Sequence, residues 1–534
     1  MENFAGTWAL IRLNLRLDRV RLPVWVLVLG LVPVSTASAF QGLYTTEASR
    51  IELAATVTSN PAFTALLGPL YDPSIGGLTA WRIGTLGSFI VGLMAVLTVV
   101  RHTRDDEETG RRELLGSTVV GRHAPLVAAF AVTVSAGALI GVIITLGLIG
   151  LGLPMTGSVA FGAGFTAVTL SFAAVGALAA QLTQDGSTAR GLGVGIVGLF
   201  FLLRMAGDVA EGEGLGWLSW LSPIGWFSRM RPFANERWWV FGLWTAFTVV
   251  VTTVAVLVQA RRDAGEGALP PRPGPARAGK GLGTAAGLAW RLQRGSLLGW
   301  TLGIGVLGVV YGAAADSIGE MLSENPRLEE IFEQLGGTQT LTDTFFATAV
   351  GIIALVATAY SIRSVLKLEV EEDALRAEHV LATATPRRRY AWSHLVYGLA
   401  GPVVILVVAG TLAGVTYGSI AGDIAGETPR VLAAAVSQLP AVWVITGASM
   451  ALYGVSPNLA PLSWGVLAFC LILGQLGAIL QFPQWSLNLS PFSHIPMIPA
   501  EDFVGAPFAI LAALAAALVG VGLIAFRNRD IAAA

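Results

Sequence analysis

The chain has 534 residues, of which 54% are hydrophobic and only 13% are charged. Soluble domains carry about 25% charged residues, so this composition excludes an ordinary soluble enzyme and indicates an integral membrane protein. The 33 basic residues nearly balance the 34 acidic ones, so the net charge gives no support for a nucleic-acid partner.

Residues 4–20 precede the first long apolar run and have the pattern of an amphipathic helix. Leu10, Leu13, Leu17 and Val20 lie on one helical stripe. A second stripe is basic and consists of Arg12, Arg16 and Arg19. The pattern predicts a helix in the membrane interface, and two interpretations stay open: a simple anchor held by lipid phosphates, or a contact surface for a partner.

Twelve apolar runs are long enough to cross a membrane, which requires about 20 residues of helix. They lie near residues 22–42, 80–100, 124–152, 156–182, 190–208, 238–259, 296–315, 345–366, 392–419, 430–455, 461–481 and 505–526. Glycine and alanine are frequent within them, and such small residues let helices pack closely where lipid provides no hydrophobic driving force. The pattern predicts an all-α integral membrane protein with about 12 transmembrane helices.

Two charged loops, at residues 101–123 and 367–391, are too long to be simple turns. In the first loop, Glu107 and Arg111 have i and i+4 spacing and Leu114-Leu115 follow, which favours a short charged helix with an apolar edge. A solvated charge run is the ordinary explanation of such a segment. Its recurrence at the matching place in the second half of the chain favours a docking element instead.

The second half of the chain repeats features of the first half. The matching features are Arg16, Arg19 and Trp25 with Arg291, Arg294 and Trp300, residues 107–115 with residues 372–380, and Ser222-Pro223 with Ser490-Pro491. We therefore predict two tandem six-span halves, residues 1–259 and 286–534. Residues 260–285 between them are rich in proline and glycine and are predicted to form a solvated linker.

Short apolar segments that contain proline precede the sixth span of each half, at residues 217–223 and 482–487. They are too short to span a membrane and are predicted to be interfacial or re-entrant helices on the outer side, with tryptophans at the depth of the lipid headgroups.

The distribution of basic residues predicts the orientation of the chain. If the N-terminus lies inside the cell, 25 of the 33 basic residues fall on inner segments. The positive-inside rule then places both termini and the 260–285 linker in the cytoplasm, with the chain in the cell membrane. The segment 316–344, which is acidic, falls on the outer side.

No catalytic or metal-binding constellation is visible in the sequence. The five histidines are scattered, and Cys470 is the single cysteine. Residues Gly274–Gly281 differ from a Walker A loop because Gly281 stands where a Ser or Thr must reach Mg²⁺, and no apolar strand precedes them. We therefore expect no enzyme activity and no cofactor in this chain.

The order of an amphipathic helix, two spans and a charged loop that reads E-E-T-G-R-R-E-L-L-G-S-T-V-V-G-R over residues 107–122 resembles the membrane subunits of ATP-binding-cassette exporters. Both halves have this order, and each has a short outer element before its sixth span. A single chain of two fused halves resembles the polyketide-antibiotic and multidrug exporter permeases of actinobacteria. The resemblance covers essentially the whole chain, although each motif is loose.

The resemblance implies that the loop after the second span of each half docks into a separately encoded ATPase. The residues that carry over are Glu107, Arg111 and Glu113 in the first half and Glu372, Arg376 and Glu378 in the second. The second copy departs from the first at Leu375, which replaces Gly110, and at Ala377, which replaces Arg112. Two ATPase copies, which hold ATP and Mg²⁺, would then drive export of an amphiphilic compound.

A secondary transporter is the main alternative, because twelve spans arranged as six plus six also occur in ion-coupled carriers, and Asp106–Arg112 loosely matches an acidic-glycine-arginine loop. Ion coupling normally uses ionisable residues at membrane depth. Here Arg82, Arg204, Asp208 and Arg363 lie near predicted span ends, which weighs against this alternative.

Overall fold

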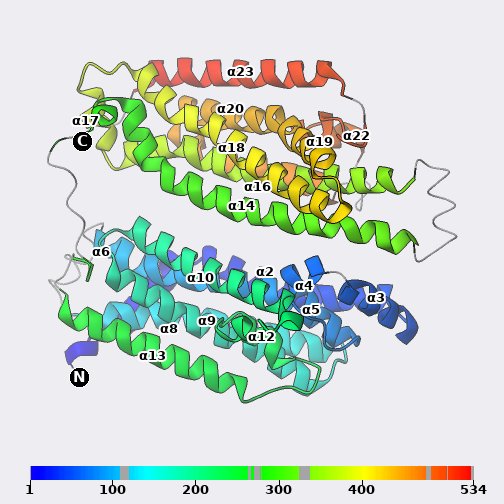
Figure 1. The fold of residues 1–534 in the computed structure, drawn as a ribbon. Coiled ribbons are helices and arrows are strands. Elements are labelled where there is room, and N and C mark those ends of the chain that lie inside the picture. The colour runs from blue at the N-terminus through cyan, green and yellow to red at the C-terminus, as the bar shows by residue number, and fades with distance from the viewer. Residues whose placement is uncertain are drawn as a thin grey trace. The chain divides into compact units, whose positions relative to one another are not determined.

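The computed structural model describes residues 2–59, 61–108, 119–262, 266–269, 277, 279–323, 337–476, 483–501 and 503–530. The chain divides into two compact units, Met1–Gly274 and Pro275–Ala534. Each unit is a bundle of long helices, and no strand occurs in the described ranges (Figure 1). The prediction of an all-α protein is confirmed.

The first unit contains the amphipathic helix and six long helices. Its elements are η1 (Glu2–Phe4), α1 (Thr7–Leu17), α2 (Arg21–Leu43), α3 (Glu47–Ser59), α4 (Pro61–Leu67), α5 (Ile75–Val100), η2 (Arg101–Asp105), α6 (Asp106–Glu108), α8 (Ala124–Gly150), α9 (Met155–Leu182), α10 (Gly186–Val209), η3 (Glu211–Glu213), α11 (Trp217–Trp220), α12 (Gly225–Met230) and α13 (Val240–Arg261).

The second unit has the same order of long helices. Its elements are η4 (Lys280–Gly283), α14 (Ala285–Ser323), α16 (Gly337–Asp373), α17 (Arg376–Leu381), α18 (Arg387–Ala421), α19 (Ile424–Ser437), α20 (Leu439–Val455), η5 (Pro457–Leu459), α21 (Leu462–Leu476), α22 (Gln484–Leu487), η6 (Pro491–His494) and α23 (Gly505–Asn528).

Twelve segments of the described chain are long and apolar enough to cross a membrane, and they fall where the sequence predicts them. Three differ in form from a single regular α-helix. The second span continues from α5 through the π-helical turn η2 into α6, and the tenth span consists of α19 and α20, which meet at Gln438. The eleventh span begins with the 3-10 turn η5 and continues in α21. Residues 101–108, at the start of the 101–123 loop, are therefore part of a span and not of a free loop.

Close helix contacts in both units depend on glycine. In the first unit, a Cβ atom on Gly141 of α8 would lie 2.5 Å from the carbonyl oxygen of Gly162 on α9. In the second unit, a Cβ atom on Gly454 of α20 would lie 2.3 Å from the carbonyl oxygen of Gly522 on α23. The backbones can approach this closely only because no side chain separates them, as the glycine-rich spans predict.

The short helices predicted before each sixth span are present. In the first unit α11 and α12 precede α13, and in the second unit α22 and η6 precede α23. Trp217 and Trp485 are more than half exposed in these elements.

The start of the predicted linker is attached to the first unit. The backbone N–H groups of Ala268 and Leu269 donate to the carbonyls of Gln181 and Leu182 at the end of α9, at 3.0 and 2.9 Å. These residues are therefore held in place by hydrogen bonds, which their proline- and glycine-rich composition does not predict.

Candidate functional site

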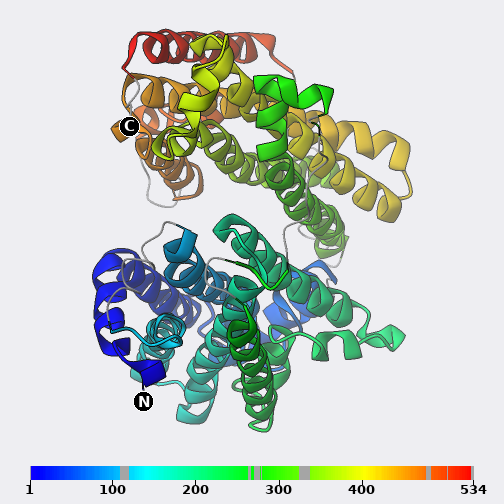
Figure 2. The ribbon, with the colours of Figure 1, turned by 90° about the vertical axis from the view of Figure 1, so that its left-hand side faces the viewer.

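The amphipathic helix α1 lies at the end of the first unit that also carries η2, α6 and the C-terminus of α13. We call this the basic end of the unit, and Figure 2 turns it toward the viewer. The predicted arginines Arg12, Arg16 and Arg19 are all exposed there. Their binding to lipid or to a partner remains a prediction.

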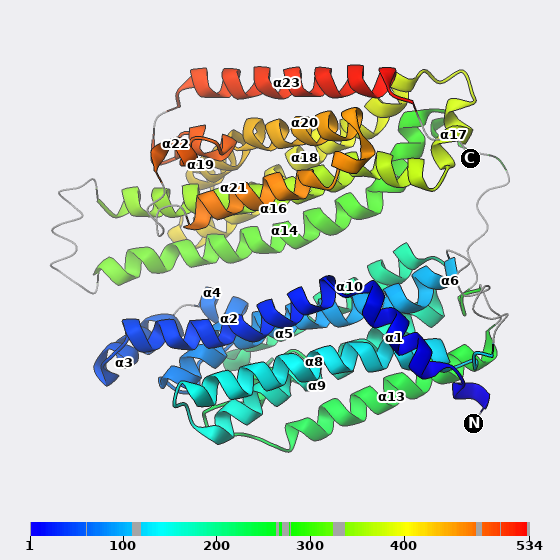
Figure 3. The same ribbon diagram turned by 180° about the vertical axis from the view of Figure 1, so that it is seen from behind.

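The buried face of α1 differs from the predicted stripe. Leu10 packs against Ala124 and Ala128 of α8, and Figure 3 shows α1 crossing α8 near its start. Leu10 and Asn14 are buried, whereas Leu13 and the remainder of the predicted stripe are exposed. The helix therefore attaches to the protein through Leu10 and Asn14 and leaves Leu13, Leu17 and its arginines available to the membrane interface.

Asp18, just after α1, ties this helix to the second span. Its carboxylate lies 2.5 Å from Nε2 of His102 and 3.3 Å from Nη1 of Arg101. Burial raises the pKa of Asp18, but the hydrogen bond with His102 and the positive charges of His102, Arg101 and Arg21 outweigh burial and lower this pKa overall.

Glu107, a predicted docking residue, is buried in an ion-pair network. Arg262, which follows the sixth span, donates from both terminal nitrogens to the two carboxylate oxygens of Glu107, at 3.1 and 2.9 Å. Arg104 donates to the same carboxylate at 2.8 Å. The side chains of Glu107 and Arg262 are only 6% and 5% exposed. Glu107 is therefore held inside the first unit by Arg104 and Arg262, and its docking role remains a prediction.

A second arginine holds the end of the sixth span in this unit. Arg122 donates from Nη2 to the carbonyl oxygens of Gln259, Ala260 and Arg262, at 2.9, 3.2 and 3.1 Å. The last carbonyls of a helix have no partners within the helix, and a cationic side chain also interacts favourably with the negative end of the helix dipole.

The residues beside Glu107 contact the fifth span. Asp105 pairs with Arg190 of α10, and Glu108 accepts a hydrogen bond from the backbone N–H of Gly186 at 2.9 Å. Arg262 also donates from Nε to Gln181, at the end of the fourth span, at 2.7 Å. The ends of the second, fourth, fifth and sixth spans therefore meet at residues 105–108.

The second unit has an equivalent arrangement around Glu372. Arg529, which follows the sixth span of this unit, donates from Nη2 to Glu372 at 2.7 Å, and the hydroxyl of Tyr453 donates to the same carboxylate at 2.6 Å. Arg387 donates to the carbonyl oxygens of Arg527 and Arg529, at 3.3 and 2.7 Å. We call the end with these residues the basic end of the second unit.

Glu372, like Glu107, is therefore buried and not exposed, with 6% of its side chain accessible. The physical reason is the same in both units: a carboxylate at the end of the second span meets an arginine that follows the sixth span. The sequence analysis missed the roles of Arg262 and Arg529. Their equivalent places after the last span of each half are the signal that could have indicated them.

The other predicted docking residues of the second unit lie on or near the surface. Arg376 begins α17 and pairs with Glu371 at 2.8 Å, and half of its side chain stays exposed. Glu378 is half-buried on the same helix. Arg111 and Glu113 lie outside the residues that the structure describes. The docking role of these four residues remains a prediction.

A charged cluster that the sequence analysis did not predict lies at the opposite end of the first unit. Asp208 of α10 accepts from Nη1 of Arg204 at 3.3 Å, from Nη2 of Arg229 at 3.2 Å and from the hydroxyl of Ser219 at 2.6 Å. Arg229 also pairs with Glu211 at 2.6 Å. Arg204 and Asp208 have fully buried side chains. The cluster ties α10 to α11 and α12.

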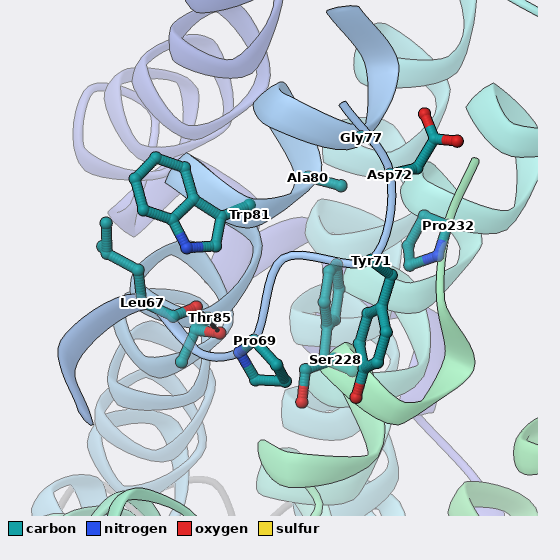
Figure 4. Close-up of a pocket in the computed structure, with 11 residues that line it drawn as sticks. Leu67, Pro69, Tyr71, Asp72, Gly77, Ala80, Trp81, Thr85, Ser228 and Pro232 are labelled. Carbon is teal, nitrogen blue, oxygen red and sulfur yellow. Dashed lines mark hydrogen bonds between the residues drawn. The ribbon is translucent and has the colours of Figure 1, made fainter. Parts of the chain in front are cut away.

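A small cleft lies near this cluster and is lined by the start of α5, the segment before it, α12 and the segment after α12. Figure 4 shows Trp81 on one side and Tyr71 on the other, with Pro69 and Thr85 between them. The Tyr71 hydroxyl is buried and has no hydrogen-bond partner among the described residues, and burial raises its pKa. The space corresponds to about one water molecule, so a drug-sized compound does not fit in this conformation.

Comparisons with known proteins give a consistent result. Residues 282–527 match the family described as "Multidrug efflux system permease Rv1217c, C-terminal domain". Over 532 residues the chain is 42% identical to the multidrug efflux system permease protein Rv1217c of Mycobacterium tuberculosis. That alignment covers 99% of this chain and 96% of the relative, so the similarity includes both units.

Proposed function

Since this chain belongs to the multidrug efflux system permease family, we propose that it is the transmembrane part of an exporter driven by a separately encoded ATPase. The similarity over nearly the full length of both proteins is the observation that carries this proposal. A permease of an efflux system moves compounds across a membrane and is not itself an enzyme. The twelve apolar helices agree with a multi-pass membrane protein.

The sequence supports a partner as the source of ATP hydrolysis. Residues Gly274–Gly281 match most of a P-loop, but Gly281 cannot supply the hydroxyl that binds Mg²⁺. ATP and Mg²⁺ would accordingly be held by the partner, whose own P-loop lysine and hydroxyl would position the phosphates.

We infer two ATPase copies from the duplication of the basic end. Each unit carries a buried carboxylate at the end of its second span, held by an arginine that follows its sixth span. A few residues after that carboxylate, each unit also has predicted docking residues. These are Arg111 and Glu113 in the first unit and Arg376 and Glu378 in the second. One ATPase would dock on each unit.

Docking of a soluble ATPase requires the basic ends to face the cytoplasm. This orientation is supported by the distribution of basic residues, because 25 of the 33 fall on inner segments. Both termini and the 260–285 linker would then lie on the cytoplasmic side of the cell membrane. The exposed arginines of α1 would then lie at the inner lipid headgroups.

The proposed substrates are amphiphilic compounds that reach the exporter from the inner leaflet or the cytoplasm. The relative is named as a multidrug permease, and a broad substrate range suits contact by apolar surface more than by a fixed polar site. A pump must also bind its substrate with different affinity in its two states, because equal affinity for both states shifts no equilibrium.

Reconstitution tests this proposal. The full chain is co-expressed with a candidate ATPase encoded beside it, purified through a tag on the chain and placed in liposomes. We expect the ATPase to co-purify and ethidium, an amphiphilic cation, to accumulate only with ATP and Mg²⁺. An ATPase variant without its P-loop lysine is the control. Ethidium accumulation driven by a proton gradient without nucleotide would contradict the proposal.

A further inference from the structure

The end of the sixth span is attached twice to the region around the second and third spans in each unit. One attachment is the buried pair between a carboxylate and an arginine, Glu107 with Arg262 and Glu372 with Arg529. The other is an arginine at the start of the third span, Arg122 or Arg387, that donates to the last carbonyls of the sixth span.

The two units build this arrangement from different neighbours. In the first unit Arg262 reaches the fourth span through Gln181, whereas in the second unit Tyr453 of the fourth span binds Glu372 directly. The guanidinium of Arg529 lies 4.9 Å from the ring centroid of Tyr453. The shared element is the link between the second and sixth spans, and it persists although the surrounding residues differ.

A simple packing role does not require charges in these places. A buried ion pair loses the hydration of both groups and is a weak source of stability compared with apolar residues of similar volume. In the first unit it does fix distance and direction, because a guanidinium and a carboxylate bind in one plane through two parallel hydrogen bonds, as Arg262 and Glu107 do. In the second unit Arg529 and Tyr453 each donate one hydrogen bond to Glu372. Through such an ion pair, a displacement of one helix end is passed to the other.

We propose that Arg262 and Arg529 are positioning residues for transport, which transmit movement of the second-span end to the sixth span of the same unit. The inference rests on the proposed function, in which an ATPase moves the segments that follow Glu107 and Glu372. Each arginine acts through its carboxylate and contacts neither nucleotide nor substrate.

The test measures the coupling between ATP hydrolysis and transport. The complex of the full chain with its ATPase is reconstituted with Arg262→Gln, Arg529→Gln or both, and ethidium accumulated per ATP hydrolysed is recorded. The matched control is Arg190→Gln, which removes an arginine that pairs with Asp105 from the fifth span. Arg262→Lys keeps the charge and loses the paired hydrogen bonds, so it is the variant of choice if Arg262→Gln is poorly folded.

For Arg262→Gln and Arg529→Gln we expect unchanged recovery of the ATPase and a KM for ATP within about twofold of the wild-type value. The amount of ethidium accumulated per ATP hydrolysed should fall by about fivefold, which is typical of residues that couple two sites. The exchange Glu372→Arg with Arg529→Glu should restore most of the ratio lost in Arg529→Gln, because the Tyr453 hydroxyl beside Glu372 can accept a hydrogen bond from an arginine as well as donate one to a carboxylate. An unchanged ratio in both single variants would overturn the inference, and so would a loss of transport that matches the loss of folded complex. Failure of the wild-type chain to bind an ATPase would instead contradict the proposed function.

Discussion

Single charged residues in this protein are buried where an oppositely charged partner reaches them. Glu107, Glu372 and Asp208 are all at the ends of spans, and each is neutralised by an arginine from another helix. A buried charge without a partner would be far more costly than an apolar residue, because it would lose its hydration without compensation.

The first residue-scale prediction concerns Asp18. Asp18→Asn should lower the free energy of unfolding by about 1.5–3 kcal/mol at neutral pH, because it removes the hydrogen bond of the carboxylate with His102 and its ion pair with Arg101. Chemical denaturation of the purified full chain in detergent measures this difference. Asp185→Asn, at an exposed carboxylate, is the control and should change stability by no more than about 0.5 kcal/mol.

The loss of stability caused by Asp18→Asn should depend on pH. The pKa of folded Asp18 is lower than its ordinary value, so Asp18 contributes stability above that ordinary value and loses it as the pH falls through the lowered pKa. The difference between wild type and Asp18→Asn should therefore be constant near neutral pH and disappear only in strong acid. A difference that persists unchanged into strong acid would contradict this prediction.

The second residue-scale prediction concerns the cluster around Asp208. Asp208→Leu should lower the free energy of unfolding by about 3–5 kcal/mol, because Arg204 and Arg229 lose a shared buried partner. Aligned on the two Ser-Pro pairs, the second half has Ile472 and Leu476 at the positions of Arg204 and Asp208.

The double variant Arg204→Ile with Asp208→Leu should therefore recover at least about 1 kcal/mol relative to Asp208→Leu alone. Equilibrium denaturation of wild type, Arg204→Ile, Asp208→Leu and the double variant measures the free energy of unfolding of all four members of this double-mutant cycle. Strict additivity of the two single effects would mean that Arg204 and Asp208 do not stabilise each other.

At the scale of elements, the two predicted docking loops begin differently. In the first unit the span ends through the π-helical turn η2, and in the second unit α16 runs to Asp373 before α17 begins. Leu375, between α16 and α17, has a φ of 58°, the left-handed conformation that glycine adopts without cost. Its counterpart in the sequence of the first half is Gly110, which lies outside the residues that the structure describes.

The element-scale prediction concerns docking by α17. Glu378→Arg should reduce recovery of the ATPase with the tagged chain by about tenfold, because reversal of a charge at a partly buried contact places like charges together. Glu113→Arg should act likewise in the first unit, and the double variant should lose most binding. Pull-down of the ATPase with each variant provides the measurement.

The control for docking is Glu47→Arg. Glu47 is an exposed carboxylate at the start of α3, away from the basic end of its unit, and its reversal should leave ATPase recovery unchanged. Equal recovery with wild type, Glu378→Arg, Glu113→Arg and their double variant would mean that neither segment binds the ATPase.

At the scale of the whole molecule, the orientation in the membrane gives a direct prediction. In a Cys470→Ser background, Arg388→Cys should react with an impermeant thiol reagent only after the cells are opened, whereas Glu47→Cys should react in intact cells. Both positions are exposed in the structure, so differences in labelling report the side of the membrane. Labelling of Arg388→Cys in intact cells would reverse the proposed topology.

The sequence was sufficient for the features that depend on composition and on local order. Length and apolarity identify the twelve spans, since a helix must satisfy its own backbone hydrogen bonds in lipid. The glycine-rich runs predict close packing, and recurrence of Ser222-Pro223 as Ser490-Pro491 indicates two similar halves. The short helices before each sixth span also follow from proline and tryptophan placed in runs too short to span.

The pairing of charges was decided only by the tertiary structure. A sequence shows that Glu107 and Glu372 stand in charged segments, which ordinarily means solvent, but not that Arg262 and Arg529 return to them from 155 and 157 residues away. The same holds for Arg204 and Asp208, whose burial depends on α11 and α12 folding over them. Burial of a charge depends on partners that are distant in the chain, whereas the hydropathy of a span is a property of consecutive residues.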